Sequence, residues 1–283
     1  MSDIFLLSTP GLDAFLANPK YQQWFLMKTK ALAVYTPGSD FVAQWFPQTY
    51  FYLDALAIFD SALVTKNPGS PALFSGDPGA QALILQDANG NPVKINWQEA
   101  DGSYHQYAAN VASLAFQQRM ITIIGGILKA GYDGIWLDDT DLVPSFVSAS
   151  GKPATPFGFD ALEWQWRFVE YLQAIRKAFP HIKILHNAVP LAPVDEAAFQ
   201  AQVAAADLIN IERGFGDPNF ANDPSRYVAL AQYIAKIHSY GGNVVVENYS
   251  KGTIAWEEPA FQAIRRPGDF EAYEDMYPDN WPL

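Results

Sequence analysis

The stretch Gly131-Tyr132-Asp133-Gly134-Ile135-Trp136-Leu137-Asp138-Asp139-Thr140-Asp141 decides the fold class. Gly131 follows an apolar helical run and suits the left-handed residue that ends a helix. The run 135–137 is short and wholly apolar, as in a strand that is covered on both faces. Three aspartates then come where the strand ends, which in α/β barrels is the edge that carries the chemistry. An Asp-rich loop that caps the next helix is the alternative explanation for these acids.

Seven apolar segments of this kind alternate with helical patterns, which indicates one α/β domain over residues 1–283. Their spacing favours a (β/α)8 TIM-type barrel. A doubly wound sheet is the rival, but its phosphate-binding G-x-G-x-x-G fingerprint is missing. No clear eighth strand is visible, and residues 1–30 are expected to form an N-terminal extension. The expected strands are 30–35, 54–60, 82–86, 134–138, 182–187, 208–212 and 243–247.

The composition narrows the range of partners. The 283 residues carry a net charge of -12, which disfavours nucleic acid and anionic membranes and favours a neutral or cationic ligand over a polyanionic one. The absence of cysteine excludes disulfides and thiol catalysis. The four histidines lack metal-ligand spacing, so no metal or cofactor is expected. No signal peptide or membrane span is predicted, so the location stays open, with an extracellular or virion-associated role fitting the expected function.

Polar or amphipathic residues stand at the carboxyl end of every expected strand. In a barrel these side chains would ring one mouth. A ring of carboxylates, an amide and aromatics, without a nucleophilic Ser or Cys beside His, suits glycoside hydrolysis, which needs one ionised and one protonated carboxyl. The ring comprises Tyr35, Asp60, Gln86, Asp138, Asn187, Glu212 and Glu247.

The favoured catalytic pair is Asp138, as nucleophile or ion stabiliser, and Glu212, as general acid/base. Glu212 follows an apolar strand, whose desolvation would suit it as the acid. Its neighbour Arg213 offers the alternative of a surface salt bridge. Glu247 is the rival acid. Asp139 would hold sugar hydroxyls or cap the next helix.

Three aromatic residues, Tyr249, Tyr35 and Trp97, are candidate stacking platforms for sugar rings, with ordinary packing as the alternative for each. The strand that ends at Asn187 also contains His186. Because neighbouring strand residues point to opposite faces, His186 is expected in the core.

The stretch 131–139 resembles the G-[FY]-D-G-[IV]-[FW]-L-D strand of TIM-barrel glycoside hydrolases. The relatives are the hypothetical glycosyl hydrolase 15 type and glycoside hydrolase family 114, whose characterised activity is endo-α-1,4-polygalactosaminidase. Segments 85–93, 110–119 and 207–212 are similar to further motifs of this group. The resemblance implies a barrel that hydrolyses a polysaccharide, with Asp138 and Glu212 as catalytic carboxylates and Asn187 as a substrate contact.

The sequence therefore predicts a glycosidase that cleaves O-glycosyl bonds in a polysaccharide or oligosaccharide without a metal. The remaining predicted substrate contacts are Tyr35, Asp60, Gln86, Asp139, Glu247 and Tyr249. One alternative is a carbohydrate-binding or structural barrel without activity. The other is a metal-dependent hydrolase built on Asp138, Asp139 and Asp141, whose oxygen ligands would suit Mg²⁺ or Ca²⁺.

Overall fold

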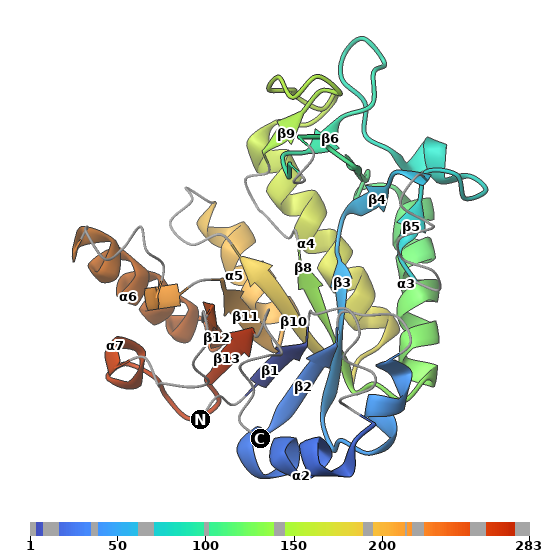
Figure 1. Ribbon diagram of the computed structural model, residues 1–283. Coiled ribbons are helices and arrows are strands. Elements are labelled where there is room, and N and C mark those ends of the chain that lie inside the picture. The colour runs from blue at the N-terminus through green and yellow to red at the C-terminus, as the bar shows by residue number, and fades with distance from the viewer. Residues whose placement is uncertain are drawn as a thin grey trace.

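In the computed structural model, eight parallel strands close into a barrel (Figure 1). The structure describes residues 4–7, 17–34, 39–61, 71–98, 102–138, 145–188, 195–212, 214–216, 224–249 and 259–274. The barrel strands are β1 (Ile4–Leu7), β2 (Ala31–Val34), β3 (Thr49–Asp54), β8 (Gly134–Asp138), β10 (Lys183–Ala188), β11 (Leu208–Ile211), β12 (Asn243–Tyr249) and β13 (Phe270–Glu274). The prediction of a (β/α)8 barrel is confirmed.

Two strands that the sequence did not reveal close the barrel. β1 pairs in parallel with β2 and with β13, so the first and last strands of the chain lie side by side. β13 is the missing eighth strand, and it also pairs with β12. The expectation that residues 1–30 form an extension is therefore wrong for Ile4–Leu7, which belongs to the barrel wall. Four residues carry too little periodicity to be recognised without their partner strands.

Helices cover the outside of the barrel. They are α2 (Pro19–Lys28), α3 (Leu114–Lys129), α4 (Ala161–Ala178), α5 (Glu196–Ala205), α6 (Pro224–Ser239) and α7 (Pro259–Gln262), with 3₁₀ turns η1 (Ser39–Gln44), η3 (Ala80–Leu83) and η4 (Gly214–Gly216). α4 begins at an N-terminal cap, since the Asp160 carboxylate accepts from the backbone N–H of Glu163 at 2.8 Å. After α3 the chain turns at Gly131, whose φ of 109° is open to glycine. Among the described helices, none is long and apolar enough to cross a membrane.

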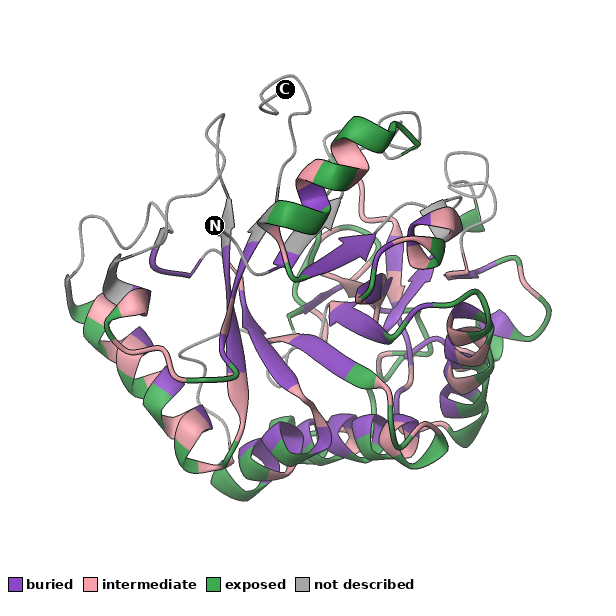
Figure 2. Ribbon diagram, turned by 90° about the horizontal axis from the view of Figure 1, so that it is seen from below, coloured by how far each residue is buried: buried purple, intermediate pink, exposed green. Residues whose placement is uncertain are grey.

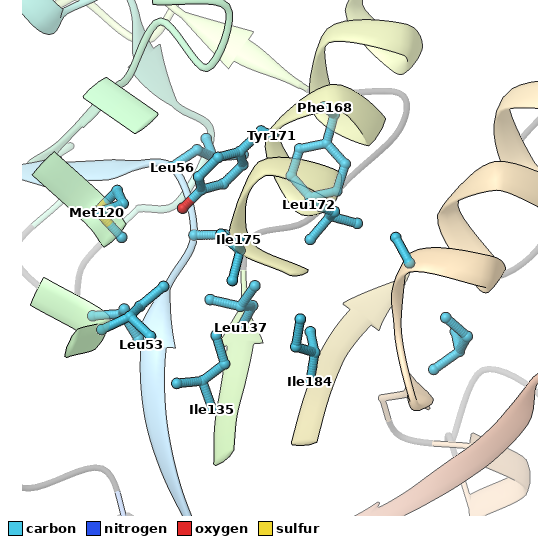
Figure 3. Packing of buried hydrophobic residues seen from close by; sticks show 14 of the residues in the cluster. Leu53, Leu56, Met120, Ile135, Leu137, Phe168, Tyr171, Leu172, Ile175 and Ile184 are labelled. Carbon is cyan, nitrogen blue, oxygen red and sulfur yellow. The ribbon is translucent and has the colours of Figure 1, made fainter. Parts of the chain in front are cut away.

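The barrel strands are largely buried (Figure 2), and they separate two packed layers of side chains. Side chains that point outward from β3, β8 and β10 meet those of α3 and α4, as Leu53, Leu137 and Ile184 illustrate (Figure 3). Side chains that point inward form a separate buried cluster in the barrel centre. Its members are Ile4, Ala31, Ala33, Tyr50, Trp136, Leu185, Leu208, Val245 and Ala272. Alternation along each strand thus fills the centre of the barrel with apolar side chains. The next inward-facing positions lie at the carboxyl ends of the strands.

A second, smaller sheet follows β3 at the carboxyl-end side of the barrel (Figure 1). Its strands run in the order β5 (Leu73–Phe74), β4 (Ala57–Phe59), β7 (Gln106–Ala108), β6 (Lys94–Ile95) and β9 (Phe146–Val147). The predicted barrel strands 54–60 and 82–86 are therefore wrong. The first spans the end of β3 and all of β4, and the second spans η3 and an isolated bridge from Ile84 to Ala109. Both runs are apolar because they contribute buried residues to the main hydrophobic core, and a short apolar run does not specify its partner strand.

Gly134, at the start of β8, provides a test of how closely the barrel strands approach. A Cβ atom there would lie 2.3 Å from the carbonyl oxygen of Lys183 on β10. We expect Gly134→Ala to lower the free energy of unfolding by about 1–3 kcal/mol, because backbone atoms must move to relieve the overlap. Gly126→Ala is the matched control. Gly126 is exposed on α3 with nothing within 4 Å of the added atom, and alanine should stabilise that helix by roughly 0.5–1 kcal/mol. Urea denaturation of both variants measures the difference, and equal stabilities would contradict the register of β8 and β10.

Candidate active site

The inward face of the barrel changes from apolar to polar two residues beyond the central cluster. On β8, Trp136 belongs to the cluster and Asp138 is the next residue on the same face. The same step leads from Leu185 to Asn187 on β10 and from Val245 to Glu247 on β12. Because successive inward positions are two residues apart, neighbouring strands in register bring these polar groups to one level. The carboxyl ends of the strands therefore hold a polar cluster above an apolar floor.

Asn187 joins the two predicted catalytic carboxylates. Its Nδ2 donates to Oδ1 of Asp138 at 2.7 Å and to Oε2 of Glu212 at 3.0 Å. The two acceptor oxygens therefore lie no further apart than 5.7 Å, the sum of these distances. Two N–H bonds of one amide diverge by roughly 120°, which corresponds to about 5 Å between the acceptors. Asp138 and Glu212 thus face one another at short range from strands that β10 separates.

The second oxygen of Asp138 also has a donor. The hydroxyl of Tyr52, on the inward face of β3, donates to Oδ2 of Asp138. Asp138 is thereby held on one side by an amide and on the other by a phenol. Such donors favour the ionised form of a carboxyl group and fix the plane of its two oxygens.

A further carboxyl group, Asp54, stands beside Asp138. The two residues are paired in register where β3 and β8 end. Burial, and after it the negative charge of Asp138, raise the pKa of Asp54 from 3.8 to about 7. The two neighbouring acids therefore hold a shared proton into the neutral pH range.

Glu247 and Asn210 extend the cluster toward β12. Glu247 is only 3% exposed and accepts a hydrogen bond of 2.6 Å from Nδ2 of Asn210, which is fully buried. The same nitrogen lies 3.3 Å from Oδ1 of Asn187. A continuous series of contacts therefore runs from Glu247 through two amides to Asp138 and Glu212.

Four of the predicted ring residues thus come together, namely Asp138, Asn187, Glu212 and Glu247. Asp60 and Gln86 do not end barrel strands: Asp60 follows β4 of the small sheet, where its backbone N–H donates to the carbonyl of His105 at 2.7 Å. Gln86 is exposed in the loop after η3. Their predicted position in the ring is wrong, and their contact with substrate stays a prediction.

Several predicted residues lie outside the part of the chain that the structure describes. Tyr35, Asp139, Asp141 and Arg213 belong to segments without described placement, and for Tyr249 only the backbone, the last residue of β12, is described. Trp97 is placed just after β6 with 54% of its surface exposed, so it is available to a ligand.

His186 is confirmed as a core residue. It is fully buried, its Nδ1 lies 2.7 Å from the backbone oxygen of Asn187, and burial lowers its pKa to about 4. It points away from the polar cluster, toward Phe168 of α4.

Sequence reasoning missed three members of the cluster, Tyr52, Asp54 and Asn210. Asn210 carried a usable signal, because a polar residue inside the apolar strand Leu208–Ile211 stands two positions before Glu212 and so shares its face. Tyr52 and Asp54 were missed because the strand was predicted to begin at Asp54, whereas it ends there. Within the described residues, no group of three or more His, Cys, Asp or Glu side chains is arranged to hold a metal ion.

Comparison with known proteins relates the fold to glycoside hydrolases. No family model and no curated protein matches the sequence. Among solved structures, the glycoside hydrolase domain of PelA from Pseudomonas aeruginosa is similar, with a TM-score of 0.54 and 12% identity over 87% of this chain and 83% of that one. Ega3 of Aspergillus fumigatus, solved in complex with galactosamine, has a TM-score of 0.50 and 11% identity over 99% and 91% of the two chains.

The α-galactosidase TtGalA from Thermus thermophilus has a TM-score of 0.59 and 14% identity. The match covers 100% of this chain but 59% of TtGalA. At such low identity these likenesses establish the fold alone: the chain has the barrel fold that glycoside hydrolases of different specificities share.

Proposed function

We propose that this protein hydrolyses O-glycosidic bonds of a polysaccharide with retention of anomeric configuration. The observation that carries the proposal is the single amide nitrogen that contacts both Asp138 and Glu212 and keeps Oδ1 of Asp138 within 5.7 Å of Oε2 of Glu212. Retaining glycosidases hold their two carboxyl groups about 5–5.5 Å apart, whereas inverting enzymes leave about 6.5–9.5 Å for a water molecule. The fold shared with glycoside hydrolases agrees with this reaction.

In this mechanism Asp138 attacks the anomeric carbon and Glu212 gives its proton to the departing glycosidic oxygen. A covalent glycosyl ester on Asp138 results, and Glu212 then takes a proton from the water that hydrolyses it. Tyr52 and Asn187 hold the two oxygens of Asp138. The apolar cluster beneath supplies a rigid floor, so little reorganisation is needed during the reaction.

The charge of the site favours a cationic or neutral sugar polymer. Four carboxyl groups, those of Asp54, Asp138, Glu212 and Glu247, meet at the mouth, in a chain of net charge -12. Galactosamine, which Ega3 holds in its solved complex, is a cationic sugar of the expected kind. We therefore propose a partly deacetylated amino-sugar polymer as the first substrate to assay, with a neutral galactan beside it.

The stereochemistry of the product tests the retaining mechanism. Proton NMR of the first minutes of hydrolysis should show a new reducing end with the anomeric configuration of the bond that was cut. The opposite anomer would refute the role of Asp138 as nucleophile. The same assay with EDTA tests the metal-dependent alternative built on Asp138, Asp139 and Asp141: activity that EDTA removes and Mg²⁺ or Ca²⁺ restores would favour that alternative.

A further inference from the structure

The proposed reaction gives no step to the carboxyl group of Glu247, although this residue belongs to the polar cluster. It is 3% exposed, points into the barrel two positions after Val245, and accepts from Asn210 at 2.6 Å. In this contact the amide nitrogen of Asn210 is the donor and a carboxyl oxygen of Glu247 is the acceptor. The contact therefore fixes the direction of the Asn210 amide, because a carbonyl oxygen turned toward Glu247 would be repelled.

The direction of one amide determines the direction of the next. With its nitrogen toward Glu247, Asn210 also presents an N–H to Oδ1 of Asn187 at 3.3 Å. Asn187 must then turn its carbonyl toward Asn210 and its NH₂ group toward Asp138 and Glu212. A primary amide has two N–H donors, and here both donors of each amide have an acceptor.

The catalytic carboxylates alone do not hold Asn187 in this direction throughout the proposed reaction. Glu212 carries a proton before it acts as an acid, and its O–H could then donate to a reversed Asn187 carbonyl. Asp138 loses its charge when it forms the glycosyl ester. The proposed steps do not involve Glu247, so its hydrogen bond with Asn210 acts on the two amides at every stage.

We propose that Glu247 is a positioning residue that keeps, through Asn210, the NH₂ group of Asn187 directed at the catalytic pair. This role rests on the proposed function and replaces the earlier alternative of Glu247 as the acid. The carboxyl groups that contact Asn187 and Asn210 are those of Asp138 on β8, Glu212 after β11 and Glu247 on β12. Tyr52 and Asp54 on β3 lie beside Asp138.

The first test needs no substrate. In ¹⁵N-asparagine-labelled protein, the side-chain NH₂ signals of Asn187 are followed by NMR from pH 4 to pH 8 in the wild type, Glu247→Gln and Glu247→Leu. We expect the Asn187 signals to move in the leucine variant and less in the glutamine variant, which still offers an acceptor oxygen. Asn210→Ala, which removes the intermediate amide, should reproduce the leucine result and provides a second route if a Glu247 variant does not fold.

Glu271→Gln is the matched control. Glu271 is 2% exposed on β13 and accepts from the amide of Gln262 at 3.0 Å, which makes it an equally buried glutamate with an amide partner outside the cluster. This variant should leave the Asn187 signals unchanged. Asn187 signals that stay at their wild-type positions in Glu247→Leu and Asn210→Ala would overturn the proposal.

The second test uses activity. We expect kcat of Glu247→Leu to fall about 10- to 100-fold with KM nearly constant, and Glu247→Gln to recover part of the loss. Both limbs of the pH–rate profile should move to higher pH, because the amide hydrogens favour ionised carboxylates. Complete loss of activity in Glu247→Gln, restored by a substrate with an activated leaving group, would overturn the proposal and make Glu247 the acid. If no glycan is cleaved by the wild type while the NMR result holds, the positioning role stands and the proposed function fails.

Discussion

Asp138→Asn and Glu212→Gln are each expected to remove nearly all hydrolysis while the thermal unfolding midpoint stays near that of the wild type. Loss of the acid should lower kcat by about 10²–10⁴-fold for a natural substrate. Loss of the nucleophile should lower kcat at least as much, because the side-chain amide of the introduced asparagine cannot form the covalent ester. Both replacements preserve the shape of the side chain, so the packing beneath the cluster is unchanged. Initial rates and calorimetry of the two variants measure these effects.

The two variants should also differ in a diagnostic way. Glu212→Gln should keep appreciable activity on a substrate whose leaving group needs no proton, and added azide should intercept its glycosyl ester. Asp138→Asn should show neither behaviour. Wild-type turnover in either variant would exclude that residue from the mechanism.

Asp54→Asn is expected to raise the free energy of unfolding at neutral pH and to leave it unchanged in acid. The pKa of Asp54 is raised from 3.8 to about 7 in the folded protein, mainly by burial and then by Asp138. Between these values the folded protein holds a proton that the unfolded chain releases, so the wild type loses stability as the pH rises through this window. Asparagine does not titrate. The gain should be absent below pH 4, grow toward pH 7 and level off at about 2–4 kcal/mol.

Asp87→Asn provides a control of opposite sign. Backbone N–H groups of Asn91 and Asn89 donate to Asp87 and lower the pKa of its carboxyl group. Its stabilising effect is present above the pKa of the unfolded chain and is lost as the pH falls through the folded pKa. Asp87→Asn should therefore destabilise at neutral pH and approach the wild type in acid. Urea titrations at several pH values measure both variants, and a pH-independent effect of Asp54→Asn would contradict the buried proton.

The stretch from Gly131 to Asp138 was predictable because each local signal agrees with the fold. Glycine ends the helix, the strand is apolar enough to be buried on both faces, and its last residue reaches the mouth. The regular alternation of helices and strands in the second half of the chain was predictable for the same reason. There the connections from α4 to β10, from α5 to β11 and from α6 to β12 are short, so each strand follows closely on a helix.

The strands in the first half of the chain were harder to predict because its apolar residues belong to two different sheets. The residues between Asp54 and Asp60 form a continuous apolar run, yet β3 ends at Asp54 and β4 belongs to the small sheet, where it pairs with β7 in the antiparallel direction. Only distant partners reveal this break. β1 and β13 likewise lie at opposite ends of the chain and pair with each other to close the barrel.

The site residues that could be predicted were those at the carboxyl ends of the predicted strands. Asp138, Asn187, Glu212 and Glu247 were found from that rule, whereas Asn210 and Tyr52 lie within strands and act by facing inward. Alternation along the strand identifies such residues once the inner face is known. The pairing of two carboxylates on one amide could not be predicted, because it depends on the stagger between β8, β10 and β11.

Trapping the covalent intermediate tests the central claim most directly. The protein is incubated with a fluorinated glycoside of the sugar it cleaves, which forms the ester quickly and loses it slowly, and the labelled peptide is identified by mass spectrometry. We predict one sugar per chain, bound to Asp138, and no label in Asp138→Asn. A label on Asp54, Glu212 or Glu247, or sustained turnover of the natural substrate with no label at all, would contradict the account.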